Sequence, residues 1–305
     1  MADPLGEVGR LAEATIAVVG LGLMGGSLAA ALRGGAGSAR QCRQVIGIVR
    51  QTDTLPLARK YVDQATTDLG AVAAADIVVL ATPARTILRL LPQVAALMRP
   101  GALLTDLGSS KAAIVDVMST LPDPILAVGG HPMCGKEAGG LAAADARLYD
   151  GAPFVLCPVP GQPAAAVEQA TALAQAVGAR PQVLAAALHD QAVAAISHLP
   201  YAMAVATVLA ATAQAETGGD LRWQLAAGGF RDTTRVAGGE IAMWTDILLT
   251  NQAAVLMQLA HARAALDALT AALAQADEVG LAALLRAAQS RRRAMFQPTT
   301  GGTDR

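Results

Sequence analysis

The chain has few cysteines, which cross-link small secreted domains, and no excess of the basic residues that bind a nucleic acid. Its three cysteines, Cys42, Cys134 and Cys157, lie far apart in 305 residues, without the spacing of metal ligands. This usage is typical of a reducing compartment and argues against a disulfide framework or a zinc site. The 23 basic and 24 acidic residues leave no electrostatic footprint for a nucleic acid. We therefore expect a cytoplasmic protein with no metal and no nucleic-acid partner.

Charged residues are missing from one long stretch, residues 191–215, which is long enough in principle to cross a bilayer. His198 and Pro200 lie within it, and alanine outnumbers leucine and isoleucine. A helix that is apolar on all sides is equally expected at the centre of a helical domain or a dimer. We expect a buried helix here and no membrane partner. Residues 1–14 also lack the apolar core of a secretion signal.

The length of the chain predicts two domains, because a single hydrophobic core rarely serves 305 residues. Continuous apolar runs alternate with helix-forming stretches over residues 1–186, which predicts an α/β Rossmann domain with a mainly parallel, doubly wound sheet. Beyond this boundary the sequence indicates an all-α domain, residues 187–305, with a frayed tail from Gln297. The expected strands are residues 15–19, 45–49, 76–83, 102–108, 125–132 and 153–159, with one more near residue 181.

A glycine pattern follows the first expected strand. Gly20, Gly22 and Gly25 read G-x-G-x-x-G at the start of a helix. In that context the glycines make a tight turn and leave backbone amides facing a pyrophosphate, so the pattern predicts a dinucleotide site. Further candidate cofactor contacts are Leu23 and Met24 within the pattern, and Thr82 and Pro83 after a later strand.

The residue after the second expected strand bears on the choice of cofactor. An NAD enzyme offers an acidic side chain to the ribose hydroxyls at this point, whereas this chain has Arg50. A guanidinium can pair with a 2′-phosphate, so the sequence favours NADP, with NAD possible. The alternative is a solvated surface arginine.

Two segments are expected to bring polar side chains to the carboxyl ends of the strands, where open α/β sheets bind their ligands. The segment GHPMCGKEAGG, residues 130–140, places His131 at a strand end, where a hydride-transfer enzyme needs a base. The segment DLGSSK, residues 106–111, offers the hydroxyl of Ser109. The alternatives are that His131 merely ends a strand, and that Ser109 or Ser110 is an ordinary helix cap.

A third segment, in the helical half, carries a cluster of charge. Arg231, Asp232 and Arg235 follow a Gly-Gly turn. A substrate with a carboxylate needs such a guanidinium fork. Salt-bridged structural arginines are the alternative.

Five segments together resemble the prephenate/arogenate dehydrogenase family of tyrosine biosynthesis. They occur in the order and approximate spacing of that family, and the match covers about residues 15–260. The sequences of two of them, HDQAVAAISHLP and GGFRDTTRVA, look closest to those of the arogenate-using, NADP-dependent members. The segments are GLGLMGGSLA, DLGSSK, HPMCGKEAGG, HDQAVAAISHLP and GGFRDTTRVA.

The resemblance implies a reaction and roles for individual residues. The reaction is an oxidative decarboxylation of arogenate or prephenate, driven by aromatisation of the ring. His131 would accept the proton of the ring hydroxyl, and Ser109 would orient that imidazole and contact the nicotinamide. Arg235 would hold a substrate carboxylate. The resemblance also implies that Glu137 and Asp232 line the entrance, that His189, His198 and Trp244 lie near the pocket, and that the helical domain forms a homodimer.

One departure from the family bears on the substrate. Prephenate-selecting members often carry a second histidine three residues after the SHLP histidine, where this chain has Tyr201. We expect this to favour arogenate, whose side chain carries an ammonium group that Glu137 could pair with.

Two other interpretations stay open. A β-hydroxyacid dehydrogenase or imine reductase would also carry GLGLMG before a helical domain, but leaves HPMCGKE unexplained. A non-catalytic NADP-sensing dimer would need no base such as His131 beside the nicotinamide.

Overall fold

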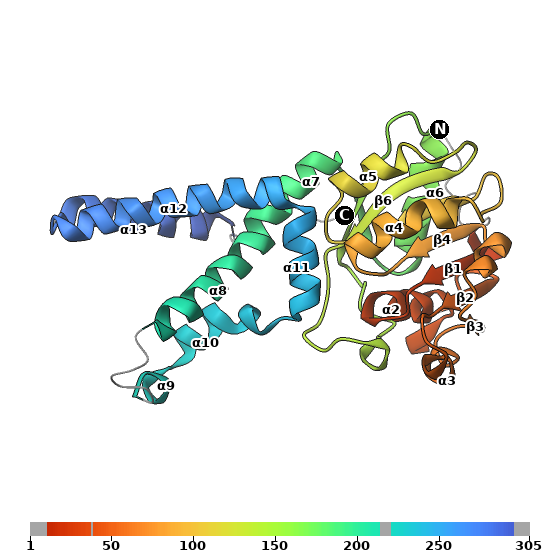
Figure 1. Cartoon of the computed structure of the whole chain (residues 1–305), viewed down its shortest axis with the longest axis horizontal. Helices are drawn as coiled ribbons and strands as arrows, with labels where there is room; N and C mark the ends of the chain where they lie inside the picture. Colours follow the sequence, from red (N-terminus) through yellow and green to blue (C-terminus); the bar gives the residue numbers. More distant parts are fainter. Residues whose placement is uncertain (1–10, 38, 214–220, 296–305) are drawn as a thin grey trace, which may run out of the picture. The chain divides into compact units, whose positions relative to one another are not determined.

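The computed structural model in Figure 1 describes residues 11–37, 39–213 and 221–295. Residues 1–10 of the N-terminal segment, where no secretion signal was expected, the tail from Gln297 and residues 214 and 215 of the uncharged stretch therefore lie outside the described residues. By its internal contacts the chain divides into two compact units, Met1–Ala254 and Val255–Arg305.

Eight strands form one sheet in the order β3-β2-β1-β4-β5-β6-β7-β8. Neighbouring strands run parallel except for β6 and β7, which are antiparallel. The predicted doubly wound, mainly parallel sheet is therefore confirmed. The strands are β1 (Thr15–Val19), β2 (Gln44–Ile48), β3 (Gln64–Thr66), β4 (Ile77–Leu80), β5 (Leu103–Asp106), β6 (Leu126–Pro132), β7 (Pro153–Pro158) and β8 (Arg180–Val183).

The sequence prediction missed β3. This strand has three residues, Gln-Ala-Thr, at the edge of the sheet, and its side chains are exposed or half-buried. A strand that buries so little has no apolar run to reveal it.

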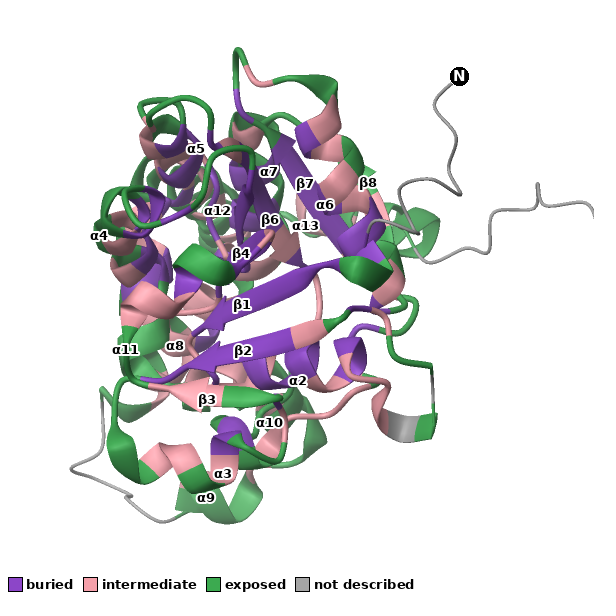
Figure 2. Ribbon diagram, turned by 90° about the vertical axis from the view of Figure 1, so that its right-hand side faces the viewer, coloured by how far each residue is buried: buried purple, intermediate pink, exposed green. Residues whose placement is uncertain are grey.

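Helices cover both faces of the sheet, as continuous apolar strands require. Along β1, Ile16 and Val18 belong to one core with α2 and α6, whereas Ala17 and Val19 belong to a second core with α4 and α5. The central strands, purple in Figure 2, are buried between the two layers. The covering helices are α2 (Leu23–Leu32), α6 (Ala164–Ala176), α4 (Ala84–Ala95) and α5 (Ala112–Met118), and the short α3 (Leu55–Ala58) precedes β3.

After β8 the described chain is helical, as predicted. The helices of the first unit that follow β8 are α7 (Ala186–Val193), a π-helical segment (Ala194–His198), α8 (Leu199–Thr212), α9 (Leu221–Leu225), α10 (Gly228–Thr234) and α11 (Ile241–Thr250). Helix α12 (Gln252–Ala274) runs from the end of the first unit into the second, where a short turn joins it to α13 (Glu278–Met295).

The uncharged stretch is helical as predicted, but the expectation that it is buried is wrong for the single chain. Ile196 is 67% exposed and Leu209 is 64% exposed, and in α8 only Ala204 is buried. Apolar composition predicts burial only where the same chain supplies a cover. Within the described residues, Ala186–Thr212 is the one helix long and apolar enough to cross a membrane, which is weak evidence because buried helices pass the same test.

A buried ion pair ties α5 to the carboxyl end of β5. The side chains of Asp106 and Lys111 are completely buried and in direct contact. Asp106 also accepts hydrogen bonds from the backbone amides of Gly108 (2.7 Å) and Gly130 (3.0 Å), and so links β5 to β6. A buried charge is tolerated only when it is paired and hydrogen-bonded, as both charges are here.

We expect Lys111→Met to lower the free energy of unfolding by about 3 kcal/mol, because it leaves the Asp106 carboxylate buried and unpaired. The double variant Asp106→Asn/Lys111→Met should recover part of that loss. Urea denaturation measures both, and Lys60→Met at an exposed lysine is the control, expected within about 0.5 kcal/mol of the parent. A Lys111→Met protein as stable as the parent would contradict the importance of the pair.

Candidate active site

The glycine turn between β1 and α2 has the shape that a dinucleotide phosphate needs. Gly20 has a φ of +96°, and a Cβ there would lie 2.8 Å from the backbone oxygen of Ala81. A Cβ on Gly25 would lie 2.0 Å from the backbone oxygen of Gly20, so this glycine lets α2 pack closely on the strand. Gly22 faces open space and caps α2 without a side-chain hydrogen bond. The bare backbone and first amides of α2 could therefore hold a pyrophosphate.

The other predicted cofactor contacts surround this turn. The backbone oxygen of Met24 accepts a hydrogen bond from the Tyr149 hydroxyl (2.8 Å), which fixes the first turn of α2 that Leu23 begins. Pro83 precedes α4. Among the described residues, Thr82 Oγ1 is buried without a hydrogen-bond partner. An orphaned hydroxyl beside Gly20 fits a site that a cofactor completes.

Arg50 follows β2, the strand next to β1, and its side chain is exposed. It has no ion pair within the part of the chain that the structure describes. The position therefore leaves the guanidinium available to an anion.

Three parallel strands, β4, β5 and β6, end at the same edge of the sheet, beside the turn after β1. This edge places Thr82 after β4, Ser109 after β5, and His131 near the end of β6. The order of strands reverses direction between β1 and β4, which is where open α/β sheets bind ligands.

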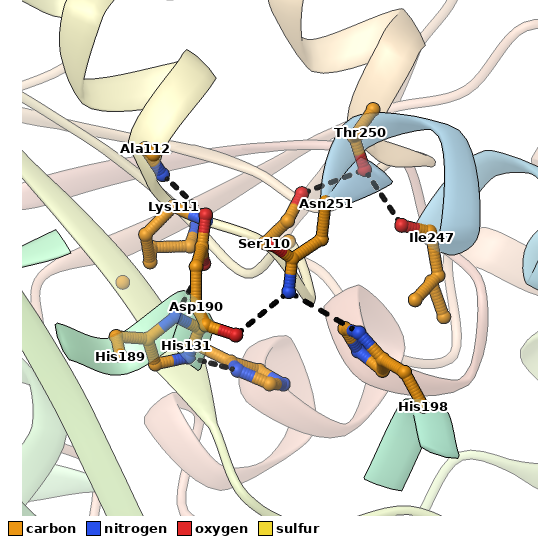
Figure 3. A network of polar contacts seen from close by, with 12 residues as sticks. Ser110, Lys111, Ala112, His131, His189, Asp190, His198, Ile247, Thr250 and Asn251 are labelled. Carbon is orange, nitrogen blue, oxygen red and sulfur yellow. Dashed lines mark hydrogen bonds and ion pairs between the residues drawn. The ribbon is translucent and has the colours of Figure 1, made fainter. Parts of the chain in front are cut away.

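His131 is the first of three side chains that contact one another in a row (Figure 3). Its Nδ1 lies 2.7 Å from Nε2 of His189, and Nδ1 of His189 lies 2.8 Å from Oδ1 of Asp190. The imidazole of His131 is half-buried, whereas His189 and Asp190 are buried. The site thus pairs a solvent-accessible imidazole with a buried carboxylate through a second imidazole.

Asp190 also holds the start of α5. Its Oδ1 accepts the backbone amide of Lys111 (2.7 Å), and its Oδ2 accepts that of Ala112 (2.8 Å). These amides have no partner inside their own helix, so a carboxylate from α7 serves as the cap. The cap that the sequence suggested, Ser110, instead donates a hydrogen bond to Thr250 at the end of α11 (2.7 Å).

The π-helical segment Ala194–His198 sets the orientation of the second predicted histidine of this region. An α-helix advances about 100° per residue, so His189 and His198, nine residues apart, would face roughly opposite sides. The π segment widens one turn. The side-chain amide of Asn251 contacts both the backbone oxygen of Asp190 (2.8 Å) and Nδ1 of His198 (3.2 Å), on either side of this segment.

Aromatic rings adjoin His198. Tyr201 and Trp244 stack with ring centroids 3.7 Å apart and planes 8° apart. His198 meets Trp244 edge-on, with centroids 6.3 Å apart. The structure therefore brings together three residues that were predicted to lie near the pocket.

The charged residues predicted to bind substrate are brought together only in part. Arg235 and Glu137, 98 positions apart in the sequence, form an exposed ion pair. Arg231 and Asp232 are exposed on α10, and neither has an ion pair with another described residue. The guanidinium fork expected from the three neighbouring charges is thus a single arginine paired with a carboxylate from the loop after β6.

The structure corrects the partner expected for His131. The resemblance implied that Ser109 orients the imidazole, but the hydrogen bond at Nδ1 of His131 is made with Nε2 of His189. In the described residues the half-buried Ser109 side chain has no hydrogen bond. The sequence prediction also missed Asp190, Asn251 and Lys111. Only Asp190 left a signal, as an acidic residue directly after a histidine.

The electrostatics of the site keep two histidines neutral. Burial is the largest cause that holds the pKa of His131 well below its usual value of about 6.5. Electrostatic repulsion from Lys111, and from His189 and His198 when they are protonated, acts in the same direction. Burial lowers the pKa of His198 to about 4, although Asp190 opposes the shift. Burial also raises the pKa of the Cys134 thiol to about 11, so this cysteine stays protonated at neutral pH.

A cavity of about 400 Å³ lies elsewhere on the sheet, at the amino ends of β1 and β4. Arg43, Asp76 and Arg99 line it. Because these strands are parallel, it opens at the edge opposite His131 and does not belong to the site described above.

Two family models together match most of the chain, from residue 36 to residue 287. The model described as prephenate dehydrogenase, nucleotide-binding domain, matches residues 36–183, and the model described as prephenate dehydrogenase, dimerization domain, matches residues 185–287. The two ranges adjoin near residue 184, whereas the compact units divide after residue 254. The domain boundary expected at residues 186 and 187 stays a prediction.

The chain is also similar to known prephenate and arogenate dehydrogenases. The prephenate dehydrogenase of Bacillus subtilis (strain 168) is 36% identical over 247 residues, covering 79% of this chain and 65% of that protein, so the chain spans just under two thirds of its length. Synechocystis arogenate dehydrogenase matches with a TM-score of 0.79 at 36% identity, covering 92% of this chain and 99% of that one. Prephenate dehydrogenase from A. aeolicus, in complex with hydroxyphenyl propionate and NAD+, matches with a TM-score of 0.83 at 27% identity, covering 92% and 98%.

Proposed function

The chain belongs to the prephenate dehydrogenase family, and from this premise we propose that it oxidatively decarboxylates arogenate to tyrosine, prephenate to 4-hydroxyphenylpyruvate, or both. The observation that carries the proposal is His131, a neutral and half-buried imidazole at the same sheet edge as the glycine turn. A base beside a dinucleotide site is what removal of a hydride from an alcohol carbon requires.

The residues of this chain divide the work of that reaction. The bound nicotinamide supplies the hydride acceptor. His131 accepts the proton of the ring hydroxyl while the carbonyl forms, and can return it to the phenolate oxygen after carbon dioxide leaves and the ring becomes aromatic. Gly20, Gly22 and Gly25 would hold the pyrophosphate, and the orphaned hydroxyl of Thr82 and the free side chain of Ser109 are further contacts available to the cofactor.

The finer assignments are arogenate as the preferred substrate and NADP as the preferred cofactor. Tyr201, stacked on Trp244, stands where prephenate-selecting members often carry a histidine, and Glu137 could pair with the ammonium group of arogenate. The unpaired Arg50 beside β2 supports recognition of a 2′-phosphate. Arg235 holds a substrate carboxylate in this proposal.

The assembly we propose is a cytoplasmic homodimer formed through the helical region. The exposed apolar side chains of α8 support this, because a second copy of the chain would cover them. The absence of membrane and nucleic-acid partners stays a prediction. A β-hydroxyacid dehydrogenase or an NADP sensor is less supported, since both family models describe prephenate dehydrogenases.

Purified protein should reduce NADP when arogenate is added, and a parallel assay with prephenate gives the preference. Replacing His131 by Asn should lower kcat by about 10²-fold or more while cofactor affinity is largely kept, because the proton acceptor is lost. His261→Gln, at an exposed histidine of α12, is the matched control. No turnover of either substrate with NADP or NAD would exclude the proposed function.

The pH profile should place the titration of His131 on the acid side of its usual range. Only the neutral imidazole accepts a proton, and its pKa is lowered, so kcat/KM should stay level as pH falls to about 6.5 and decline only below it. The groups that face His131 are His189 and Asp190 on α7, His198 on the π segment, and Lys111 with Asp106 beside α5. An acid limb centred near pH 6.5, the usual pKa of a histidine, would show that the site does not depress this pKa.

Arg235→Ala should raise KM by about tenfold or more with a smaller change in kcat, because a charge-assisted hydrogen bond to the substrate is lost. Glu137→Gln should lower KM for prephenate, since the substrate carboxylate would no longer compete for the guanidinium. Arg89→Ala, at an exposed arginine of α4, is the control for loss of positive charge. An unaltered KM in Arg235→Ala moves the carboxylate contact to another residue.

Arg50→Asp should lower the ratio of kcat/KM for NADP to that for NAD by about tenfold or more, because an attractive charge becomes a repulsive one. Arg89→Asp makes the same charge change on α4 and serves as its control. The same ratio before and after the Arg50 substitution would mean that Arg50 does not contact the phosphate.

A further inference from the structure

We propose that Asp190 and His189 fix the tautomer of His131, so that Nδ1 carries the proton and Nε2 is the atom that accepts the proton of the substrate. The inference deepens the proposed function and rests on it for the identity of the reaction. His189 and Asp190 are positioning residues, because they act on the imidazole of His131. They act through two hydrogen bonds in a row, one from His131 to His189 and one from His189 to Asp190.

The direction is set at Asp190. An ionised carboxylate has no proton to donate, so each group that contacts it must be a donor. The backbone amides of Lys111 (2.7 Å) and Ala112 (2.8 Å) are donors by nature. Nδ1 of His189, 2.8 Å from Oδ1, must therefore carry a proton.

That proton decides the next bond. A neutral imidazole that is protonated at Nδ1 has a lone pair at Nε2. Nε2 of His189 lies 2.7 Å from Nδ1 of His131, so the bond forms only if Nδ1 of His131 donates its proton. The lone pair of His131 is then left at Nε2.

The surroundings hold this arrangement in place. His189 is 1% exposed, and the backbone oxygen of Asp190 accepts a hydrogen bond from Asn251 (2.8 Å). Lys111, the other buried charge nearby, has its ammonium group in contact with Asp106. The carboxylate of Asp190 is thus satisfied by three N–H donors, those of Lys111, Ala112 and His189. This is the logic of a carboxylate that orients a catalytic imidazole in hydrolases.

The opposite arrangement is well defined. A doubly protonated His189 would donate to both Asp190 and His131, which would make Nδ1 of His131 the acceptor and move its proton to Nε2. His131 could not then serve as the base through Nε2. The two arrangements differ in which ring nitrogen of His131 carries hydrogen, which is directly measurable.

The first test measures that tautomer in the free protein. Nitrogen-15 labelling of histidine gives signals from the four histidines of the chain, and single His→Gln substitutions, including the exposed His261, assign them. We expect His131 and His189 each to be protonated at Nδ1 and unprotonated at Nε2 at neutral pH. A His131 protonated at Nε2 overturns the inference. Because no substrate is needed, this result is independent of whether either substrate turns over.

The second test removes the acceptor opposite His131. His189→Leu should lower kcat by about 10²-fold with KM within about threefold, and should shift the tautomer ratio of His131 in the nitrogen-15 spectrum. His189→Gln places an amide oxygen near the position of Nε2 and should restore much of kcat. Full kcat in His189→Leu, or equal losses in the two variants, overturns the positioning role, whereas failure of the parent to turn over substrate overturns the proposed function instead.

Discussion

The carboxylate of Asp190 is the group on which the arrangement of the site depends. It accepts the first backbone amides of α5 and the imidazole of His189, and its backbone oxygen accepts the side-chain amide of Asn251. Through its side chain Asp190 therefore fixes the start of a helix from the nucleotide-binding half and the second imidazole of the row, and through its backbone oxygen it holds the residue after α11. Because Asp190 is buried, its hydrogen bonds are strong. Losing one of them would lower the stability of the fold, since the donor left behind would be buried without a hydrogen-bond acceptor.

The features that could be predicted from the sequence are those that depend on residues close together in the chain. The glycine turn lies within six consecutive residues, from Gly20 to Gly25, and local backbone sterics determine its conformation. The apolar strands and the placement of His131 at the end of β6 follow from runs of a few residues. Contacts across the chain were not predictable: Asp190 meets Lys111 over 79 positions, and Arg235 meets Glu137 over 98. The expected role of Ser109 beside His131 was taken from the family, and the contact found instead comes from His189.

Exposed side chains mark the parts of the described molecule that are open to a ligand or to another chain. The ion pair of Arg235 and Glu137 is open to solvent, so a carboxylate ligand can exchange with Glu137 without crossing a packed core. The apolar face of α8 carries Leu209 on its exposed side, while Tyr201 near its start stacks on Trp244.

The wide turn between α7 and α8 has a consequence for how the segment can vary. The exposed side chains of Ala195 and Ile196 can be exchanged while the helix keeps its path, but adding a residue to the α-helical turns of α7 rotates everything that follows by about 100°. Such a change would swing His198 and Tyr201 away from Asn251 and Trp244 together. The spacing of the two histidines is thus more constrained than the identity of the exposed residues of the π segment, Ala195 and Ile196.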